Sequence, residues 1–346
     1  MLATTPLVHT PKHSLVSQAV AGMRNFDAEF TDLNQYIRVI TDRIWEQRRI
    51  DDIHAYYSDP CIVETPSNVS TSLQTVIDGT RATLGAFPDR RLLAEDVIQS
   101  GDDVGGYLSS HRIISPMTHL GSGAFGAPTG KAIQVRTIAD CVCKDNKIIH
   151  EWLVRDVGAI ALQIGSTPQA LAQRWLDERH ANGITALKPA AGSAPHGYVS
   201  HISKLALPQA YAQALDNFAN GNFQAHSLYD EAVHQLGSNA SSHYGHEATL
   251  AYWQNLFTAL PAQSFTVEHL AMQTGDDRPT RTAMRWRAQC LHTGIGKFGL
   301  ATGKPVEIMG ISHAEWHKGK VLREWVLIDE VALWMQILNS TQLSKQ

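Results

Sequence analysis

The sequence predicts an α+β fold of two tandem cone-shaped domains, each a curved antiparallel sheet wrapped on helices that precede it in the chain. Three observations predict this fold: an internal repeat, helical spacing of apolar residues at the start of each repeat, and alternating apolar and polar residues towards its end. The length agrees, because 346 residues suffice for about two domains of roughly 150 residues each.

The repeat aligns without a gap over more than forty positions at an offset of 173 residues. Residues 119–131 (HLGSGAFGAPTGK) coincide with residues 292–304 (HTGIGKFGLATGK), and residues 146–156 (NKIIHEWLVRD) coincide with residues 319–329 (GKVLREWVLID). The chain is therefore a tandem duplication of one domain of about 135 residues.

Helical spacing opens each repeat, and strand-like alternation closes it. In the first repeat, apolar residues from Tyr36 to Trp45 predict one helix, and Ile53 to Tyr57 predict a second. The second repeat copies the pattern from Tyr211 to Phe218 and from Phe223 to Tyr229. Alternation predicts four strands in the first repeat, over residues 97–103, 107–114, 133–143 and 147–156.

Composition places the domain boundaries. Residues 1–30 form an N-terminal extension, in which Leu15 to Phe26 predict one helix, and the first domain covers residues 31–166. Residues 167–204 begin with a short helix that has Pro168 in its first turn and continue as a Pro/Ala/Gly linker. The second domain covers residues 205–340.

The charge balance and the hydropathy pattern exclude several classes of protein. With 29 Lys and Arg against 33 Asp and Glu, the net charge is −4, which argues against a nucleic-acid-binding surface. No apolar run has the length of a signal peptide or of a membrane-spanning helix, so we expect a soluble, cytoplasmic protein that contacts no membrane. The four cysteines are scattered and predict no disulfide framework.

The sequence predicts neither a metal nor a cofactor. His243 and His246 are the nearest approach to a metal-ligand pair, and no further His or Cys stands at ligand spacing. The glycine-rich residues 121–126 are followed by Pro-Thr-Gly instead of a helix start, which favours a loop between strands over a phosphate site.

A set of motifs carries a family resemblance. They are a Phe-Pro-Asp step at residues 87–89, a Gly-Asp-Asp turn at 101–103, the pattern H-x-G-x-G-x-F-G-x-P-T-G-K from His119, and a closing strand K-I-I-x-E-W-x-x-x-D that ends at Asp156. The chain resembles the SnoaL-like polyketide and ester cyclases of the nuclear transport factor two-like superfamily. Members of this family are usually single-domain chains that associate. The resemblance thus implies that the two halves form an intramolecular pseudo-dimer, alone or within a larger homo-oligomer.

The resemblance also implies a site. In the polyketide cyclases of this family, an aspartate on a late strand acts as the general acid/base of an intramolecular aldol ring closure, without metal or cofactor. The matching positions are Asp156 and Asp329. One carboxyl can take a proton from a carbon acid and return it to the carbonyl oxygen, provided that an apolar pocket raises its pKa. The alternative for each aspartate is a cap at a strand end or a surface ion pair.

Alternation in the last strand gives a geometric expectation for these aspartates. It puts Trp152, Val154 and Asp156 on one face, which we expect to line the pocket, and Trp325 accompanies Asp329 in the same way. Trp152 and Trp325 are therefore candidate substrate-binding residues. A packed core is the alternative for both.

The hairpin before the last strand sets the neighbours of each aspartate. A three-residue loop with a bulge would make Arg136 a diagonal neighbour of Asp156 and hold that carboxylate ionised. Met309 takes the place of Arg136 in the second repeat, so we expect Asp329 in apolar company, with the higher pKa and most of the activity. Arg136 and Met309 are likewise candidate substrate contacts.

His119 and His292 precede a glycine in the repeated loop segment. Either imidazole can polarise a substrate carbonyl or, as the alternative, hydrogen-bond the backbone of the turn. With the two aspartates they complete the candidate catalytic set.

These motifs predict cofactor-independent acid/base catalysis, of cyclase, isomerase or lyase type, on a small hydrophobic carbonyl compound in a cone-shaped pocket. The alternative is a non-catalytic tandem domain that binds a small molecule or a protein. A pocket with one isolated carboxyl favours the enzyme, and a pocket with only apolar groups favours the binder.

Overall fold

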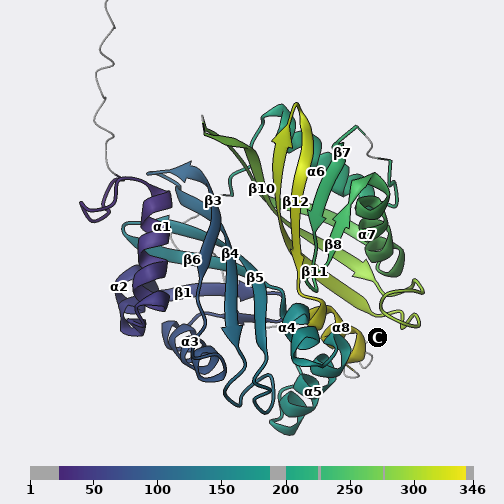
Figure 1. The fold of residues 1–346 in the computed structure, drawn as a ribbon, viewed down its shortest axis with the longest axis horizontal. Coiled ribbons are helices and arrows are strands. Elements are labelled where there is room, and N and C mark those ends of the chain that lie inside the picture. The colour runs from purple at the N-terminus through teal and green to yellow at the C-terminus, as the bar shows by residue number, and fades with distance from the viewer. Residues whose placement is uncertain (1–22, 188–199, 225–226, 276, 340–346) are drawn as a thin grey trace, which may run out of the picture.

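Two six-stranded sheets organise the chain, one in each half. The computed structural model describes residues 23–187, 200–224, 227–275 and 277–339. The strand order is β2-β1-β6-β5-β4-β3 in the first sheet and β8-β7-β12-β11-β10-β9 in the second, so the two halves share one topology (Figure 1). The prediction of two tandem α+β domains is confirmed.

The elements follow one another in a similar order in the two domains. The first domain contains α1 (Leu33–Thr41), a π-helical turn (Asp42–Glu46), a 3₁₀ turn (Ile50–Asp52), α2 (Ile53–Tyr56), β1 (Tyr57–Thr65), β2 (Asn68–Ser70), α3 (Leu73–Ala86), β3 (Leu93–Asp102), β4 (Gly106–Thr118), β5 (Ala132–Lys144), β6 (Lys147–Arg155) and α4 (Val157–Ile164), and α5 (Pro168–Ala181) follows it. The second contains α6 (Ala206–Ala219), β7 (Tyr229–Leu236), β8 (Ser242–Tyr244), α7 (Gly245–Ala259), β9 (Ala262–Gly275), β10 (Arg278–Leu291), β11 (Pro305–His317), β12 (Lys320–Ile328) and α8 (Glu330–Leu338).

The predicted antiparallel sheets are in fact mixed, because the first strand of each domain lies beside the last strand and runs parallel to it. In the first domain Val63 on β1 pairs with Glu151 on β6, and in the second Gln235 on β7 pairs with Glu324 on β12. All other neighbouring strands are antiparallel. The arrangement places the start of β1 beside the start of β6, where Tyr57 pairs with Ile148, and the end of β1 beside the middle of β6.

Local signals explain where helices begin. The Asp32 carboxylate accepts a hydrogen bond from the Gln35 N–H and caps α1, and Thr167 caps α5 just before Pro168. None of the helices in the described ranges is long and apolar enough to span a membrane.

Two predicted helices differ from the structure. The helix predicted from Ile53 ends at Tyr56, because Tyr57 already pairs with β6. The helix predicted from Phe223 to Tyr229 is wrong in its described residues, because residues 223–224 and 227–228 are not helical and Tyr229 begins β7. Most of the helix predicted over residues 15–26 lies outside the described residues, and residues 23–26 are not helical.

The hairpin between β5 and β6 has a two-residue turn, so the predicted three-residue loop is wrong. Asp145 and Asn146 both take left-handed backbone conformations, with φ of 49° and 64°. Aspartate and asparagine tolerate this conformation better than most residues, and two of them in succession suit the tight turn that joins twisted strands. Val154 consequently pairs with Ile138 instead of Arg136.

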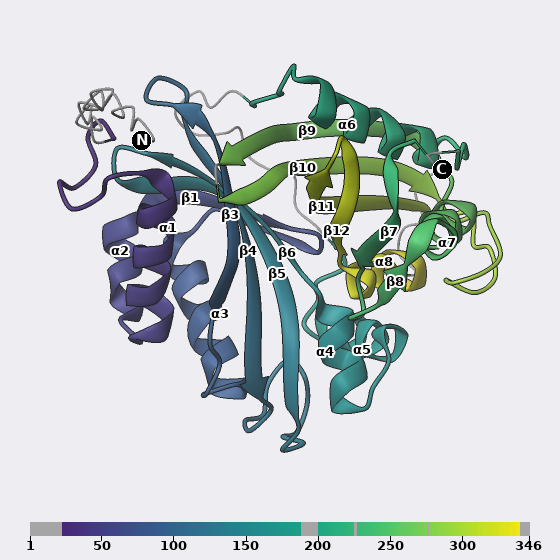
Figure 2. The same ribbon diagram turned by 45° about the horizontal axis from the view of Figure 1, so that its top comes forward.

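The two sheets face each other across the domain interface, and helices lie on their outer sides (Figures 1 and 2). Strands β3, β5 and β6 contact β9, β10, β11 and β12 across this interface. At one end of the interface, α4 and α5 pack against α8. Each sheet therefore has two buried faces, one on its own helices and one on the other sheet.

Reciprocal contacts give the interface an approximate two-fold symmetry. The Arg112 guanidinium lies 3.5 Å from the centre of the Trp325 ring, and Arg285 lies 3.6 Å from that of Trp152. The repeat makes Arg285 the equivalent of Arg112, and Trp325 the equivalent of Trp152. The two halves thus form an intramolecular pseudo-dimer.

Candidate active site

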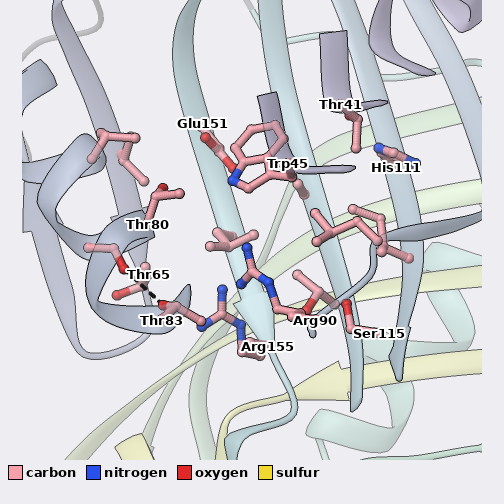
Figure 3. A pocket seen from close by; sticks show the side chains of 18 of the residues that line it. Thr41, Trp45, Thr65, Thr80, Thr83, Arg90, His111, Ser115, Glu151 and Arg155 are labelled. Atoms are coloured by element: carbon pink, nitrogen blue, oxygen red, sulfur yellow. Dashed lines mark hydrogen bonds between the residues drawn. The ribbon is translucent and has the colours of Figure 1, made fainter. Parts of the chain in front are cut away.

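A cavity of about 370 Å³ lies inside the first domain, between the sheet and the helices α1 and α3 (Figure 3). This volume is in the range of small-molecule binding sites. Much of the wall is apolar, and its polar groups come from α1, α3, the β-strands and the segment before β3. They include Thr41, Thr65, Thr80, Thr83, Arg90, His111, Ser115, Thr137, Glu151 and Arg155.

Strand β6 presents Glu151, Leu153 and Arg155 to the cavity. The predicted alternation is therefore present, but the predicted face is wrong. Trp152 and Val154 belong to a buried cluster between the two sheets, together with residues of the second domain. The face that carries the tryptophan is apolar because the other sheet covers it.

Glu151 is the carboxyl of the cavity wall, and its side chain is 8% exposed. The Tyr57 hydroxyl donates a hydrogen bond of 3.1 Å to Glu151 Oε2, and the described residues supply no other hydrogen bond to this carboxyl. Burial raises the pKa of Glu151 to about 7, although the Tyr57 hydrogen bond and the Arg155 charge act to lower it. A carboxyl with this pKa can both accept and return a proton at neutral pH.

Two guanidiniums, those of Arg90 and Arg155, lie next to each other at one side of the cavity (Figure 3). Arg48 fixes the backbone at Arg90, since its Nη2 donates to the Arg90 carbonyl oxygen at 2.8 Å. Burial, followed by the charges of Arg155 and Arg48, lowers the pKa of Arg90 to about 9. Neither guanidinium has a carboxylate partner among the described residues, and Arg90 Nε has no hydrogen bond there.

His111 on β4 supplies a neutral imidazole to the wall. Burial, followed by the charges of Arg38 and Arg112, lowers the pKa of His111 to about 3, so the ring carries no charge near neutral pH. Its Nε2 has no hydrogen-bond partner among the described residues. A neutral imidazole in this place can donate to, or accept from, a ligand.

In the second domain, large side chains occupy the corresponding interior. Trp253 and Trp286 are fully buried in its core, where the repeat places Thr80 and Ile113 in the first domain. Thr80 and Ile113 both line the cavity. Two smaller residues have therefore been exchanged for tryptophans, whose buried rings take up space that the cavity leaves open in the first domain.

Gly310 makes room for one of these tryptophans. A Cβ atom at this position would meet the Trp286 ring at 2.2 Å, far closer than any real contact. Gly310 pairs with Trp286 across β10 and β11, and the equivalent pair in the first domain is Thr137 with Ile113. The two domains thus differ at matched positions, and the difference decides which interior is open.

Glu324, the equivalent of Glu151, is saturated with hydrogen bonds. Tyr211 donates to it at 2.6 Å, Tyr229 at 3.1 and 3.2 Å, and the Gln235 amide at 2.8 Å. Burial raises its pKa as well. Because three side chains hold this carboxyl in a filled interior, Glu324 acts as a structural group, whereas Glu151 has one donor and faces a cavity.

The two predicted aspartates cap helices. The Asp156 carboxylate accepts from the Ala159 N–H of α4 at 3.1 Å, and from the Asn239 and Ala240 N–H groups of the second domain at 2.8 and 2.9 Å. Asp329 caps α8 through bonds of 3.0 and 3.2 Å from its first turn. Neither carboxyl belongs to the lining of the first-domain cavity. A catalytic role for either one stays a prediction.

The pKa values of the aspartates have a different cause from the expected one. Burial raises the pKa of Asp156 to about 6 and that of Asp329 to about 7. Arg136 is not the origin of the difference, because its guanidinium pairs with Glu95 at 2.8 Å. Backbone N–H groups of the second domain act to lower the pKa of Asp156, and the charge of Asp156 acts to raise that of Asp329.

The predicted substrate contacts lie elsewhere. Trp152 and Trp325 lie at the domain interface, where Arg285 and Arg112 stack on their rings. Met309 belongs to the cluster between the sheets. None of them, nor Arg136, contributes to the lining of the first-domain cavity. Trp45, from the π-helical turn after α1, does line it.

His119 and His292 take equivalent places at the base of the β4–β5 and β10–β11 loops. The His119 Nδ1 lies 3.3 Å from Thr129 Oγ1, and the His292 Nδ1 lies 3.0 Å from Thr302 Oγ1, so each ring is tied to its own loop. Neither ring lines the cavity, although His119 packs against Phe87, which does.

The part of the chain that the structure describes contains no group of three or more His, Cys, Asp or Glu side chains that could hold a metal ion. His243 Nε2 lies 3.1 Å from Ser241 Oγ, and His246 Nε2 lies 3.0 Å from the Tyr229 carbonyl oxygen.

Sequence reasoning missed Glu151, Arg90 and Arg155. A comparison of the two repeats, position by position, contains a signal for the arginines. Arg155 corresponds to Ile328 and Arg90 to Gln263, so both charges occur in one copy alone. A charge that replaces an apolar residue on a strand face buried in the other copy indicates a cavity or a partner.

The comparisons with known proteins agree with this architecture. The family model of SnoaL-like polyketide cyclases matches residues 35–164 and 209–337, and no curated protein matches the chain. Similar solved structures include IdmH from Streptomyces antibioticus (17% identity, TM-score 0.33, 38% of this chain and 99% of that one). AclR from Streptomyces galilaeus has 20% identity and a TM-score of 0.34, over 38% of this chain and 95% of that one. A SnoaL-like polyketide cyclase from Agrobacterium tumefaciens has 22% identity and a TM-score of 0.31, over 38% of this chain and 98% of that one. The two family matches together cover more than half of the chain, one in each domain, and the chain therefore belongs to the SnoaL-like polyketide cyclase family.

Proposed function

We propose that the first domain carries the activity and that Glu151 acts there as general acid/base on a small, largely apolar carbonyl compound. One observation carries the proposal: a buried carboxyl with a single hydrogen-bond donor faces a cavity of ligand size. A pocket with one carboxyl favours an enzyme over a simple binder, because a binding site for an apolar molecule gains nothing from a buried acid.

The chemistry that this carboxyl can perform begins with a carbon acid. The Glu151 carboxylate takes a proton from the carbon next to a carbonyl group, and the C–H electron pair moves into an enolate whose charge rests on oxygen. In an isomerisation, Glu151 returns the proton to a different carbon. In a ring closure, the enolate carbon bonds to a second carbonyl carbon, and Glu151 gives its proton to the resulting alkoxide. Both sequences regenerate the carboxylate.

Neighbouring groups support these steps. Burial raises the pKa of Tyr57 well above its ordinary value, so its hydroxyl stays protonated and keeps donating to Glu151. The neutral His111 and the wall hydroxyls offer donors for the oxygen on which charge develops. The apolar remainder of the wall strengthens each of these interactions, because it excludes water.

The test is proton exchange on simple ketones in D₂O, followed by proton nuclear magnetic resonance with cyclohexanone and 4-phenyl-2-butanone as probes. We expect the wild-type chain to accelerate the loss of the α-proton signals. Glu151→Gln should remove most of the acceleration, by a factor of roughly a hundred or more. The matched control is Glu324→Gln, the same change at the equivalent position of the filled domain, which should leave the exchange rate unchanged.

Three outcomes decide the matter. Loss of exchange in Glu151→Gln alone supports the proposal. Equal exchange by Glu151→Gln and the wild type would contradict it, whatever the control does. Binding of both ketones without exchange above the buffer rate would favour the non-catalytic alternative.

A further inference from the structure

Two guanidiniums, those of the buried Arg90 and the half-buried Arg155, line the first-domain cavity without an ion pair among the described residues. Arg90 is 6% exposed, and the charge of Arg155 acts to lower its pKa. The opposite charges that act on Arg155 are those of Asp329 and Glu151, and the one that acts on Arg90 is that of Glu46, each from beyond ion-pair distance. A buried cation without a partner costs several kcal/mol, so such pairs occur where a ligand supplies the missing charge.

The charges of the wall define what that ligand must carry. His111 is neutral, so Arg90, Arg155 and Glu151 are the charged groups of the described lining. With Glu151 ionised the wall has a net charge of one positive unit, and with Glu151 protonated it has two. An enolate oxygen is negative only during the reaction and cannot compensate this charge in the resting complex. A permanently ionised group on the ligand can.

We propose that the ligand of this cavity is a small apolar molecule with a carboxylate, and that Arg90 and Arg155 together bind the carboxylate. The inference rests on the proposed function of the same cavity, because it names the substrate class. Guanidiniums suit this role, since their planar forks match the two oxygens of a carboxylate.

The position of the arginines relative to Glu151 supports a substrate that carries its carboxylate at one end and its reacting carbon at the other. Arg155 follows Glu151 by four residues on the same face of β6, which separates their Cα atoms by about 13 Å. Figure 3 shows the two guanidiniums together and Glu151 apart from them, with the Trp45 ring beside the carboxyl. A ligand anchored by its carboxylate at the arginines would therefore present a more distant carbon to Glu151.

The second domain offers a natural comparison. Ile328 and Gln263 replace the two arginines there, and tryptophans fill the interior. The arginine pair thus occurs together with the open cavity and is absent from the filled copy. This correlation is expected if the arginines serve a ligand, and it has no reason to exist if they serve the fold.

The experiment compares two probes that differ by one charge, 4-oxo-4-phenylbutanoate and its methyl ester, by calorimetric titration of the full chain at pH 7. We expect the acid to bind the wild type more tightly than the ester by roughly ten- to a hundredfold. Arg90→Gln and Arg155→Gln should each bring this ratio close to one. Arg81→Gln, which neutralises a half-exposed arginine paired with Asp51 on the surface, is the control and should retain the ratio.

A second variant covers the case in which the glutamine variants fold poorly. Arg90→Met keeps the length of the side chain and removes its charge, so the melting temperature of the free protein should rise, and stabilisation by the acid should disappear. A lower melting temperature in Arg90→Met would show a structural role for Arg90 and overturn the inference. Equal affinity for acid and ester, no affinity for the acid, a ratio that both glutamine variants retain, or preferential stabilisation by inorganic phosphate would overturn it too.

Failure of this inference is distinguishable from failure of the proposed function. Glu151→Gln removes a negative charge from the wall, so it should bind the acid at least as tightly as the wild type. If the arginine variants lose the preference while Glu151→Gln keeps its exchange activity, the carboxylate site stands and the acid/base role falls. If Glu151→Gln loses exchange while the arginine variants keep the preference, the reverse holds.

Discussion

Glu151 and Glu324 occupy the same place in the repeated fold, and their neighbours give them different properties. A tyrosine at the start of the first strand, Tyr57 or Tyr229, donates to each carboxyl. The residue paired with the glutamate differs, because Val63 stands in the first domain where Gln235 donates in the second. The repeat makes the two glutamates visible as equivalents in the sequence. It does not reveal which one faces a cavity, because that depends on side chains from α3, β4 and β5.

The titration of Glu151 should make the stability of the chain depend on pH. The groups that face this carboxyl include Tyr57 and the thiols of Cys61 and Cys141, which stay protonated because burial raises the pKa of each. The Cys143 thiol also acts on this carboxyl and stays protonated because burial raises its pKa, and the Arg155 guanidinium stays positive in this pH range. The pH dependence from this site therefore belongs to Glu151.

Glu151 has a pKa of about 7 in the folded chain against an ordinary value of 4.5, so the folded state binds its proton more tightly. Its contribution to stability is complete below pH 4.5 and is lost as the pH rises to 7, by about 3 kcal/mol. Glutamine does not titrate. Glu151→Gln should therefore be increasingly more stable than the wild type between pH 5 and 7, in urea unfolding followed by tryptophan fluorescence. Parallel stability curves for the two proteins would contradict the raised pKa.

Strand β6 shows what the alternation of residues predicts about a strand and what it does not. Alternation along the strand correctly separates Glu151 and Arg155 from Trp152 and Val154. The pattern cannot state which set faces the helices, because both faces of the sheet are buried and the second domain covers the more apolar one. The end of the strand was also beyond the pattern, since Asp156 leaves the sheet to cap a helix.

The helix cap at Asp156 should contribute to the stability of the folded chain. Its carboxylate accepts one bond from α4 and two from the second domain, so Asp156→Ala leaves one buried and two part-buried N–H groups without this acceptor. We expect a loss of roughly 2–4 kcal/mol of unfolding free energy. Asp156→Asn, which keeps one carbonyl oxygen, should lose less. Unchanged stability in Asp156→Ala would contradict the structural role.

The whole molecule is a pseudo-dimer in which one interior is open and the other is filled. The repeat, the order of the elements and the family follow from the sequence, since spaced motifs survive duplication. The filling of the second interior follows from exchanges such as Thr80 for Trp253 and Ile113 for Trp286, which lie on different elements. Their common effect appears only when the fold brings them together.

A double-mutant cycle tests the filling. Gly310→Thr should destabilise the chain by about 1–3 kcal/mol, because the new Cβ meets the Trp286 ring. Trp286→Ile should also destabilise it, since it leaves a void of side-chain size. The double variant installs the Ile–Thr pair of the first domain and should cost clearly less than the sum of the two changes. Additive losses in thermal unfolding would mean that the two positions do not oppose each other.

The proposed function makes Glu151 the base, and neither helix-capping aspartate. All three carboxyls have a raised pKa near neutrality, at about 7 for Glu151, 6 for Asp156 and 7 for Asp329, so the pH dependence of one variant alone does not separate them.

The most direct measurement is the pH–rate profile of α-proton exchange for the wild type, Glu151→Gln, Asp156→Asn and Asp329→Asn. A base acts in its ionised form, so the wild-type rate should rise with pH and level off above an inflection near 7. Asp156→Asn and Asp329→Asn should keep this inflection, even if they unfold more easily, and Glu151→Gln should abolish the pH-dependent rate. An inflection that persists in Glu151→Gln and vanishes in either aspartate variant would contradict the claim and return the chemistry to the helix caps.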